Sequence, residues 1–530
     1  MNFTSYEFIL LTGLILVVYY CVPKRFQWMF LLAASYGMYA SAGWMCLVYI
    51  SITTFSTYLA AVKISKLSGQ KADYLKEHRN GMDKEARKAY KDSIKRKQKV
   101  WLWIALAVDI GLFVVLKYSN FFIGNINALC SGLEQWKIIP YTEFLVPLGI
   151  SFYTFQSMGY LLDVYNEKEN AQKNYAKLAL FVGFFPQLSQ GPISRYEDLS
   201  RSLYCGHEWN AETVCFGLQR ILWGYFKKLV IADRISIGLK TILAAPEQYQ
   251  GIYFGVAMIF YAVQLYADFT GGIDIAVGIA QAMGITLKEN FMRPFFSKSI
   301  KEYWNRWHIS MGSWFKDYLF YPLSVSKTML RISKKSRKLL GEEAGKRVPV
   351  YLTTSIVWFC TGIWHGASWN FVVWGLANCA VLLVSRELTP VYRWCHQHFS
   401  LEKKKWYPVF CVCRTVVLMS ALRMFDCYRD VRIPVRLFFG MFTENNFSEL
   451  WNGGLLRLGL SMADYIILLC GAVLMLSVSL VQRKQPVRKT VSELPYPVRT
   501  ALWLLLFTAV LLLGAYGQGY EESQFIYNQF

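Results

Sequence analysis

Proton transfer near neutral pH is most often carried out by histidine, and this 530-residue sequence contains only six of them. They are His78, His207, His308, His365, His396 and His398. His78 lies in a strongly charged segment, and His396 and His398 lie in a basic turn, so these three are interpreted as solvated surface residues. His207, in CGHEWN, has no evident partner in the sequence. The other two are the candidates for chemistry.

His365 stands between Trp364 and Gly366 in the middle of an otherwise apolar segment. An ionisable side chain at membrane depth carries a desolvation cost, which makes it a functional candidate by default. Its neutral imidazole can accept a proton from a reacting group. The alternative is a structural histidine whose hydrogen bonds hold the turn of a hairpin.

His308 lies in KEYWNRWHISMGSWFKDYLFYPL, a stretch rich in Trp and Tyr of the kind found at a membrane interface. Alone, it is interpreted as an interface residue. Together with His365, which would lie deeper, it would allow a reaction centre reached from both sides of the membrane. The spacing of the two residues does not show that they meet.

Three carboxylates also lie in apolar sequence, Asp109 in AVDIGL and Asp268 and Asp274 in YADFTGGID. Asp268 is the strongest of them because the nearby pair of glycines allows close approach of another backbone. Helix capping is the favoured structural role for each carboxylate. The twelve cysteines are interpreted as small buried apolar residues, and their spacing predicts no metal site. No Walker loop, GxSxG elbow, HExxH pair or GxGxxG fingerprint occurs in a credible context.

The elements that position these residues must be membrane helices. The sequence is 54% hydrophobic and 17% charged, with a mean hydropathy of +0.26, whereas soluble proteins average about 25% charged residues. Apolar runs recur from the first residues to the last, which predicts a multi-pass membrane protein. The net charge of +22 is assigned to cytoplasmic loops and not to nucleic-acid binding.

The basic segments set the predicted topology. Three apolar stretches at 6–22, 27–41 and 44–62 precede the segment 63–99, which has thirteen Lys and Arg against five Asp and Glu in helix-forming spacing. The positive-inside rule places that segment in the cytoplasm and hence the N-terminus outside. A fourth span is predicted near 100–118. Later spans near 408–425, 461–481 and 499–515 return the C-terminus to the outside.

Two regions depart from simple membrane spans. Residues 143–300 are apolar but interrupted by VPLGISFYTF, FFPQLSQGPISRY, ADFTGGID and MGITLKENFMRPF, which predicts short, tilted or re-entrant helices around an internal cavity. Residues 351–386 contain TGIWHGASWN at their middle and have basic sequence on both sides, which predicts a membrane hairpin with arms of fewer than 20 residues. His365 then lies within the membrane envelope. No separate soluble domain is expected.

Several ordered motifs are similar to those of one family. They are YYCVPKRFQWMFLLAASYGMYA, VPLGISFYTFQSMGYLLDVY, FFPQLSQGPISRY, YADFTGGIDIAVGIAQAMGI, KENFMRPFFSKSIKEYWNRWHISMGSWFKDYLFYPL, TGIWHGASWNFVVWGL and the terminal FIYNQF. With these motifs the sequence resembles the membrane-bound O-acyltransferase superfamily. Within it, the sequence is most similar to the bacterial branch of alginate O-acetylation and teichoic acid D-alanyl transfer proteins.

The resemblance implies an all-α polytopic membrane protein with a core of transmembrane, tilted and re-entrant helices around a central tunnel or funnel. It implies N-terminal helices over 1–118, a catalytic core over 119–390 and C-terminal helices over 391–530, within a single integral membrane domain. His365 looks like the family's general base, and His308 like the second histidine towards the acyl donor.

Other positions carry weaker implications or depart from the family pattern. Asn305 and Asp268 are possible supporting groups. Asn378 stands where alginate-type relatives often have a histidine, so no role is carried over to it. The sequence YPLSVSK lacks the two glycines common in relatives, which puts the loop after Pro322 in doubt.

The function implied is transfer of a short acyl group, acetyl above all, from a cytoplasmic thioester to a hydroxyl of an extracytoplasmic polysaccharide. The acceptor could instead be an extracytoplasmic acyltransferase or esterase-type partner. The donor would be acyl-CoA or an acyl carrier protein, with no bound cofactor, and the protein would lie among the lipids of a bacterial cell membrane. One alternative is D-alanyl transfer from a carrier protein to teichoic acid. Another is a non-catalytic pathway or scaffold for a polysaccharide-modifying complex.

Overall fold

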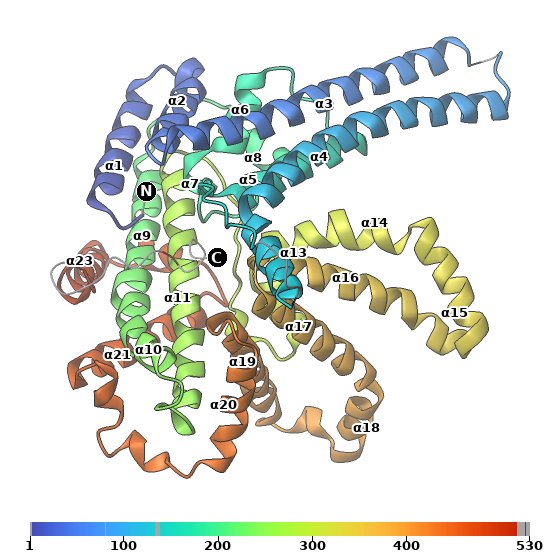
Figure 1. The fold of residues 1–530 in the computed structure, drawn as a ribbon. Coiled ribbons are helices and arrows are strands. Elements are labelled where there is room, and N and C mark those ends of the chain that lie inside the picture. Colours follow the sequence, from blue (N-terminus) through green and yellow to red (C-terminus); the bar gives the residue numbers. More distant parts are fainter. Residues whose placement is uncertain (1–2, 80, 133–137, 517–524, 526–530) are drawn as a thin grey trace. The chain divides into compact units, whose positions relative to one another are not determined.

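The computed structural model of the chain describes residues 3–79, 81–132, 138–516 and 525, and within these residues it contains helices and no β-strand (Figure 1). The chain divides into two compact units, Met1–Gly217 with Ile279–Lys288, and Leu218–Gly278 with Glu289–Phe530. Seven described helices are long and apolar enough to cross a membrane, namely α3, α4, α11, α17, α19, α21 and α23. The predicted polytopic all-α fold is therefore confirmed.

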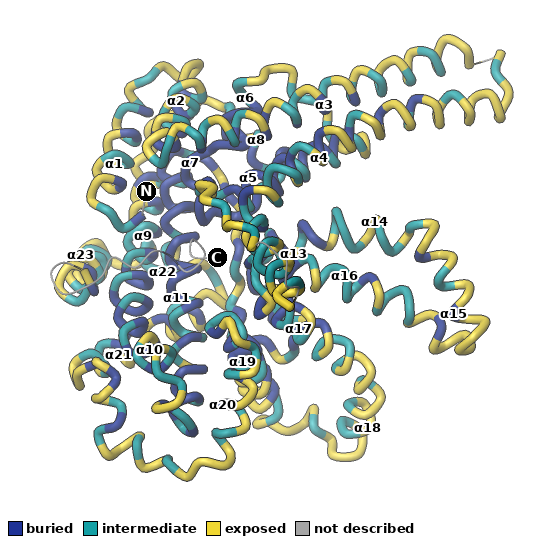
Figure 2. The backbone as a smooth tube through the Cα atoms, in the orientation of Figure 1, coloured by how far each residue is buried: buried dark blue, intermediate teal, exposed yellow. Residues whose placement is uncertain are grey.

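The first unit begins with the three predicted helices. Its helices are α1 (Tyr6–Cys21), α2 (Gln27–Ala40), α3 (Trp44–Glu77), α4 (Lys84–Cys130), α5 (Ile150–Tyr165), α6 (Tyr175–Gly183), α7 (Phe185–Leu188), α8 (Tyr196–Leu203) and the start of α9 (Ala211–Tyr225). The basic segment 63–99 is helical on both sides of a short turn, because α3 and α4 continue into it as a long hairpin (Figure 1). The far ends of this hairpin are mostly exposed (Figure 2).

Asp109 joins the two helices of that hairpin. It is fully buried in the interior of α4 and accepts hydrogen bonds from Ser56 Oγ at 2.7 Å and Thr57 Oγ1 at 3.0 Å, both on α3. The predicted capping role is therefore wrong for Asp109. The actual N-cap of α4 is Asp83, whose side chain accepts from the backbone N–H of Ala86 at 2.6 Å.

Other expectations for this unit need correction. His207 does have partners, since its Nε2 lies 2.8 Å from Ser202 O and its backbone N–H donates to Gln27 Oε1 at 2.8 Å. Across both units, five of the twelve cysteines in the chain are exposed and not buried. These are Cys21, Cys205, Cys215, Cys413 and Cys470.

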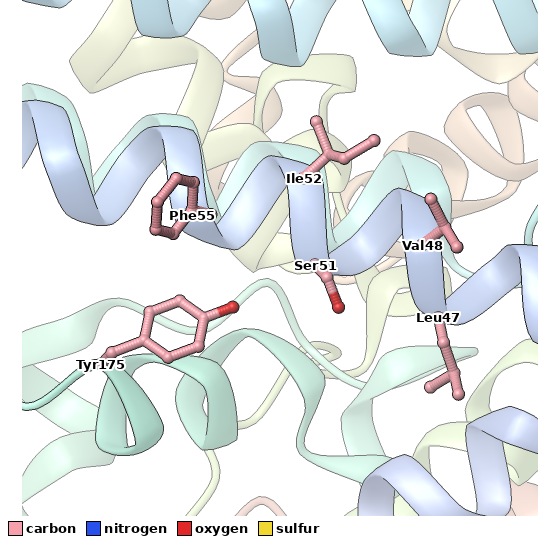
Figure 3. A pocket seen from close by; sticks show the side chains of 6 residues that line it. All are labelled: Leu47, Val48, Ser51, Ile52, Phe55 and Tyr175. Carbon is pink, nitrogen blue, oxygen red and sulfur yellow. The ribbon is translucent and has the colours of Figure 1, made fainter.

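A shallow groove of about 540 Å³ lies between α3 and α6 (Figure 3). Its walls are Leu47, Val48, Ser51, Ile52 and Phe55 of α3 and Tyr175 of α6. Two hydroxyls are its polar groups, and it contains no histidine or carboxylate that could transfer a proton at neutral pH. The candidate chemistry lies elsewhere.

The second unit contains both candidate histidines. Its helices are the end of α9, a π-helical segment (Phe226–Ala232), α10 (Asp233–Ala244), most of α11 (Ile252–Ala282), α12 (Ile300–Arg306), α13 (Ile309–Phe315), a second π-helical segment (Lys316–Phe320), α14 (Tyr321–Ser324), α15 (Lys327–Gly345), α16 (Arg347–His365), α17 (Trp369–Glu387), α18 (Thr389–Phe399), α19 (Tyr407–Cys427), α20 (Arg432–Thr443), α21 (Met462–Val481), α22 (Val487–Ser492) and α23 (Tyr496–Leu513). Of the seven candidate spans, α11 is the most enclosed, with 56% of its apolar window buried against 6% for α23.

One predicted interruption is wrong. The segment ADFTGGID lies inside the continuous helix α11, so it neither breaks the helix nor caps it. Gly271 instead permits close packing against α9, because a Cβ atom there would lie 2.9 Å from the carbonyl oxygen of Gly224. Small residues allow helix backbones to approach closely in membranes. By contrast, the predicted interruption after residue 282 is confirmed, since α11 ends at Ala282 and irregular backbone follows.

The region 351–386 forms the predicted helical hairpin as α16 and α17, two helices of 19 residues each, of which α17 is among the seven candidate membrane spans. The helices approach closely at two glycines. A Cβ atom on Gly375 would lie 2.5 Å from Trp358 O, and one on Gly362 would lie 2.5 Å from Phe371 O. His365 is the last residue of α16, so this contact determines where its ring lies relative to α17.

We expect Gly375→Ala to destabilise the protein, because its Cβ atom would meet backbone and not a flexible side-chain end. Overpacking of this kind costs about 1–3 kcal/mol. The matched control is Gly440→Ala in α20, where a Cβ atom has no neighbour within 4 Å and alanine favours the helix. The unfolding midpoint in detergent should fall for Gly375→Ala only. Equal midpoints for the two variants would contradict the close packing.

Candidate active site

His308 occupies the short connection between α12 and α13 and is fully buried. Its φ of 50° is a left-handed conformation, which residues other than glycine rarely adopt and which often marks a functional site. The buried Asn290 holds it there. The backbone C=O of Asn290 accepts from the N–H of Ile309 at 3.0 Å, and its Oδ1 accepts from the N–H of Ser310 at 2.8 Å.

The same asparagine sets the state of the His308 ring. Asn290 Nδ2 lies 3.2 Å from His308 Nδ1, and an amide nitrogen can only donate, so Nδ1 accepts and the neutral ring carries its proton on Nε2. Burial, and secondly the positive charge of Arg423, lower the pKa of His308 from 6.5 to about 3. The ring is therefore neutral at physiological pH.

His365 is buried at the end of α16, and the backbone then turns through Gly366 into α17. Its ring contacts that of Trp374 on α17, with centroids 4.6 Å apart. Gly366 is required by this turn, because a Cβ atom there would lie 2.3 Å from the ring of Phe371. The contact with Phe371 therefore explains why a glycine follows His365 in the WHG sequence.

The structure brings the two candidate histidines into one aromatic cluster. The ring of Trp364 lies 5.9 Å from that of His308 and 5.2 Å from that of His365, centroid to centroid. Phe269 of α11 packs against His308 on another side, at 5.0 Å. His308 and His365 are 57 positions apart in the sequence, and both lie next to the indole ring of Trp364. The sequence alone did not show this relation.

A buried cation lies next to this cluster. Arg423 of α19 pairs with Asp426 at 3.2 Å, and its guanidinium lies over the rings of Trp304, Trp307 and Trp374 at 5.0–5.3 Å. Cation–π contacts of this kind stabilise a desolvated guanidinium. Because Trp374 also contacts His365, the cation helps to fix the wall against which that histidine packs.

Asp268 belongs to a separate ionic network that joins α11 to α9 and to the π-helical segment that follows α9. Lys228 pairs with Asp268 at 2.7 Å and with Asp233 at 2.8 Å. Lys227 donates to Asp274 at 2.6 Å and to Thr270 Oγ1 at 2.8 Å. Asp268 and Asp274 are therefore ion-pair partners and not helix caps.

Arg220 completes this network by donating to Asp274 at 2.8 Å and to both oxygens of Glu289 at 2.6–2.7 Å. The ring of Phe525, the one residue of the terminal FIYNQF that is described, lies 4.5 Å over Lys228 Nζ. The other five residues of that motif lie outside the described residues. Phe269, the neighbour of Asp268 in sequence, packs its ring on His308.

The sequence also pointed to two asparagines, Asn305 and Asn378. Asn305 is exposed on α12 and has no described contact with either histidine. Asn378 is fully buried on α17, where its Nδ2 donates to Trp374 O at 2.8 Å. No group of three or more His, Cys, Asp or Glu with metal-binding geometry occurs among the described residues.

Comparison with known proteins assigns the chain to a family. Residues 45–422 match the sequence model of the MBOAT, membrane-bound O-acyltransferase family, and this range includes both histidines of the cluster. The chain belongs to the membrane-bound O-acyltransferase family. The family assignment from the sequence motifs is thereby confirmed, and the chain is a multi-pass membrane protein of this acyltransferase family.

Individual relatives of the family carry different names. The chain is 30% identical over 400 residues to a probable alginate O-acetylase of Azotobacter vinelandii, covering 73% of this chain and 69% of that protein. It is 30% identical to the peptidoglycan O-acetyltransferase of Helicobacter pylori, covering 58% of each chain. It is 28% identical to the teichoic acid D-alanyltransferase of Bacillus subtilis, covering 58% of this chain and 76% of that protein. With some alginate O-acetylase relatives, the match spans about half of their length.

Sequence reasoning missed several residues in and around this candidate site. Lys227, Lys228 and Arg423 are ionisable residues inside apolar stretches, YFKKLVIAD and SALRMFD, and that pattern alone could have marked them as partnered or functional. Asn290 carries no such signal, because a single asparagine in an irregular segment has many possible roles. Its importance comes from the loop that brings it against His308.

Replacing Lys228 by methionine should destabilise the protein by about 3–5 kcal/mol, because the buried Asp268 and the partly buried Asp233 would lose this cation. The measurement is the unfolding midpoint in a fixed detergent, followed by circular dichroism. Lys338→Met on the exposed face of α15 removes the same charge and should leave the midpoint unchanged. A Lys228→Met protein as stable as the control would show that the network does not hold α9 and α11 together.

Proposed function

We propose that this protein transfers a short acyl group, acetyl in the first place, from a cytoplasmic thioester to the hydroxyl of an extracytoplasmic polysaccharide or of a partner acyltransferase. The observation that carries the proposal is the aromatic cluster in which Trp364 contacts the rings of both His308 and His365. The relatives named alginate O-acetylase and peptidoglycan O-acetyltransferase support acetyl as the group and a glycan as the acceptor.

In this proposal His365 is the general base. The acceptor hydroxyl attacks the thioester carbonyl carbon while His365 takes its proton, and the thiolate then leaves as the tetrahedral intermediate collapses. The thiolate of the donor takes up a proton after it leaves. Burial of His365 among tryptophan rings excludes water that would otherwise hydrolyse the donor.

His308 is proposed to act on the donor side. Because its Nδ1 accepts from Asn290 and its ring is neutral, its Nε2 carries a proton and can donate a hydrogen bond. A donor of this kind suits the carbonyl oxygen of a thioester, on which negative charge develops during attack. Asn290 is then a positioning residue, and Arg423 stabilises the wall shared with His365. Asn305 and Asp268 are proposed to support the fold around the site, without contact to the reacting groups.

The donor is proposed to be acyl-CoA or an acylated carrier protein, without a bound cofactor. The basic helices of residues 63–99 and 327–347 could attract its phosphates or the acidic surface of a carrier. The protein is proposed to lie in a bacterial cell membrane with both termini outside. A tunnel through the helices would join the cytoplasmic donor to an external acceptor, with an esterase-type protein as a possible partner.

A second candidate is D-alanyl transfer to teichoic acid from a charged carrier protein. It is favoured by the similarity to the teichoic acid D-alanyltransferase of Bacillus subtilis, which covers 76% of that protein. The histidine cluster serves this reaction equally well, because the bond that breaks is again a thioester. The two candidates differ in the donor that the protein accepts.

The decisive measurement is acyl transfer by the purified protein in nanodiscs with labelled acetyl-CoA, followed on protein, glycan and water. We expect His365→Ala to lower the transfer rate about 10²–10⁴-fold, as for loss of a general base, and His308→Ala to lower it as well. His398→Ala, at an exposed position of α18, is the matched control and should retain full activity.

The possible results separate the candidates. Turnover of a carrier-bound D-alanyl thioester, with none of acetyl-CoA, would favour the teichoic acid reaction. Activity of a folded His365→Ala protein equal to that of wild type would rule out the proposed base. Failure of wild type with every donor would favour a non-catalytic pathway or scaffold.

A further inference from the structure

A second site lies in the same unit, away from the histidine cluster. It is a partly open cavity of about 430 Å³ lined by the end of α9, by the π-helical segment after it, and by α21, α22 and α23. Its wall is apolar over most of its area and includes Trp223, Phe226, Leu474, Leu506 and Ala509. The volume lies in the range of small-molecule binding sites. None of the aromatic residues around His308 and His365 lines it.

One end of the cavity is cationic. Arg488 of α22 lines this end, is half-buried, and has no ion-pair partner among the described residues. Its neighbour Arg220 is different, because Asp274 and Glu289 already neutralise it. Burial and the charge of Arg220 lower the pKa of Arg488, and the two carboxylates only partly oppose this effect. A guanidinium remains charged under such conditions. Because Asp274 and Glu289 already pair with Arg220 and Lys227, Arg488 gives this end a net positive charge.

Two further polar groups in the cavity wall lack partners. Gln219 Oε1 and Trp503 Nε1 are buried, and neither has a hydrogen-bond partner among the described residues. Buried polar groups are normally hydrogen-bonded, and one without a partner calls for an explanation such as a missing ligand. The cavity therefore combines an apolar body with unpaired polar atoms.

The surroundings indicate what kind of molecule carries the anion. Helices α21 and α23 are the least enclosed of the seven candidate spans, with 22% and 6% of their apolar windows buried, so lipid chains can reach the cavity wall. The connection beside the cavity carries Arg483, Lys484, Arg488 and Lys489, and the next acidic residue is Glu493. Basic pockets between membrane helices bind the headgroups of anionic lipids.

We propose that this cavity binds one anionic phospholipid, with an acyl chain along the apolar wall and the headgroup phosphate on Arg488. A zwitterionic lipid would satisfy the apolar wall but would bring its own cation to the basic end. A soluble anion would satisfy Arg488 but would leave the apolar wall in contact with water. An anionic phospholipid satisfies both parts, and this site does not depend on the acyltransferase reaction.

The test compares lipid binding by the purified full chain in detergent, using native mass spectrometry with phosphatidylglycerol and phosphatidylcholine of the same chain length. Wild type should bind phosphatidylglycerol about fivefold more tightly or better, as expected for one basic residue at a membrane surface. Arg488→Gln should lose this preference. Its matched control, Lys338→Gln on exposed α15, should keep it.

The apolar wall is tested separately. Ala509→Phe places a ring in the cavity and should abolish binding of both lipids at this site, whereas Leu512→Phe, on the exposed face of the same helix, should not. If Ala509→Phe fails to fold, Leu506→Trp fills the same space. Equal binding of the two phospholipids by wild type, an unchanged preference in Arg488→Gln, or binding of a free fatty acid as tight as that of phosphatidylglycerol would overturn the proposal.

Discussion

An ionisable side chain inside a bundle of membrane helices must be paired or kept neutral, and the second unit of this protein depends on that constraint. Lys227 and Lys228 are paired with carboxylates of α11, and Arg423 is paired with Asp426 and covered by tryptophan rings. His308 is instead kept neutral by burial. The lysine pairs connect α11 to the segment after α9, and the tryptophans over Arg423 connect α19 to α12 and α17.

Close helix packing is the second feature that the site requires. Gly224 and Gly271 allow α9 and α11 to approach closely beside the lysine pairs, and Gly362 and Gly375 do the same for α16 and α17 beside His365. A methyl group added to any of these four glycines would collide with the backbone of the facing helix. The glycines thus set the helix separations, and the charges and aromatic rings then fill the defined space.

Much of this arrangement could be predicted from the sequence, because the relevant signals are local. The apolar runs, the basic segment 63–99 and the hairpin around His365 were all recognisable from composition and spacing, and the structure contains the corresponding helices. The errors arose where a local pattern has two meanings. Glycine and aspartate in ADFTGGID can interrupt a helix or pack within it. Only the neighbouring glycine of α9 and the lysines of the π-helical segment after α9 decide for packing.

The sequence by itself determined that the chain is an all-α membrane protein of the O-acyltransferase type and that His308 and His365 are its candidates for chemistry. Apolar length, charge asymmetry and short motifs are properties of contiguous residues, so they need no coordinates. Only the tertiary structure decided that both histidines contact Trp364, that Asn290 sets the protonated nitrogen of His308, and that Asp268 pairs with Lys228. The contacts Asn290–His308, Lys228–Asp268 and His308–Trp364 join residues 18, 40 and 56 positions apart, and their geometry depends on how whole helices pack.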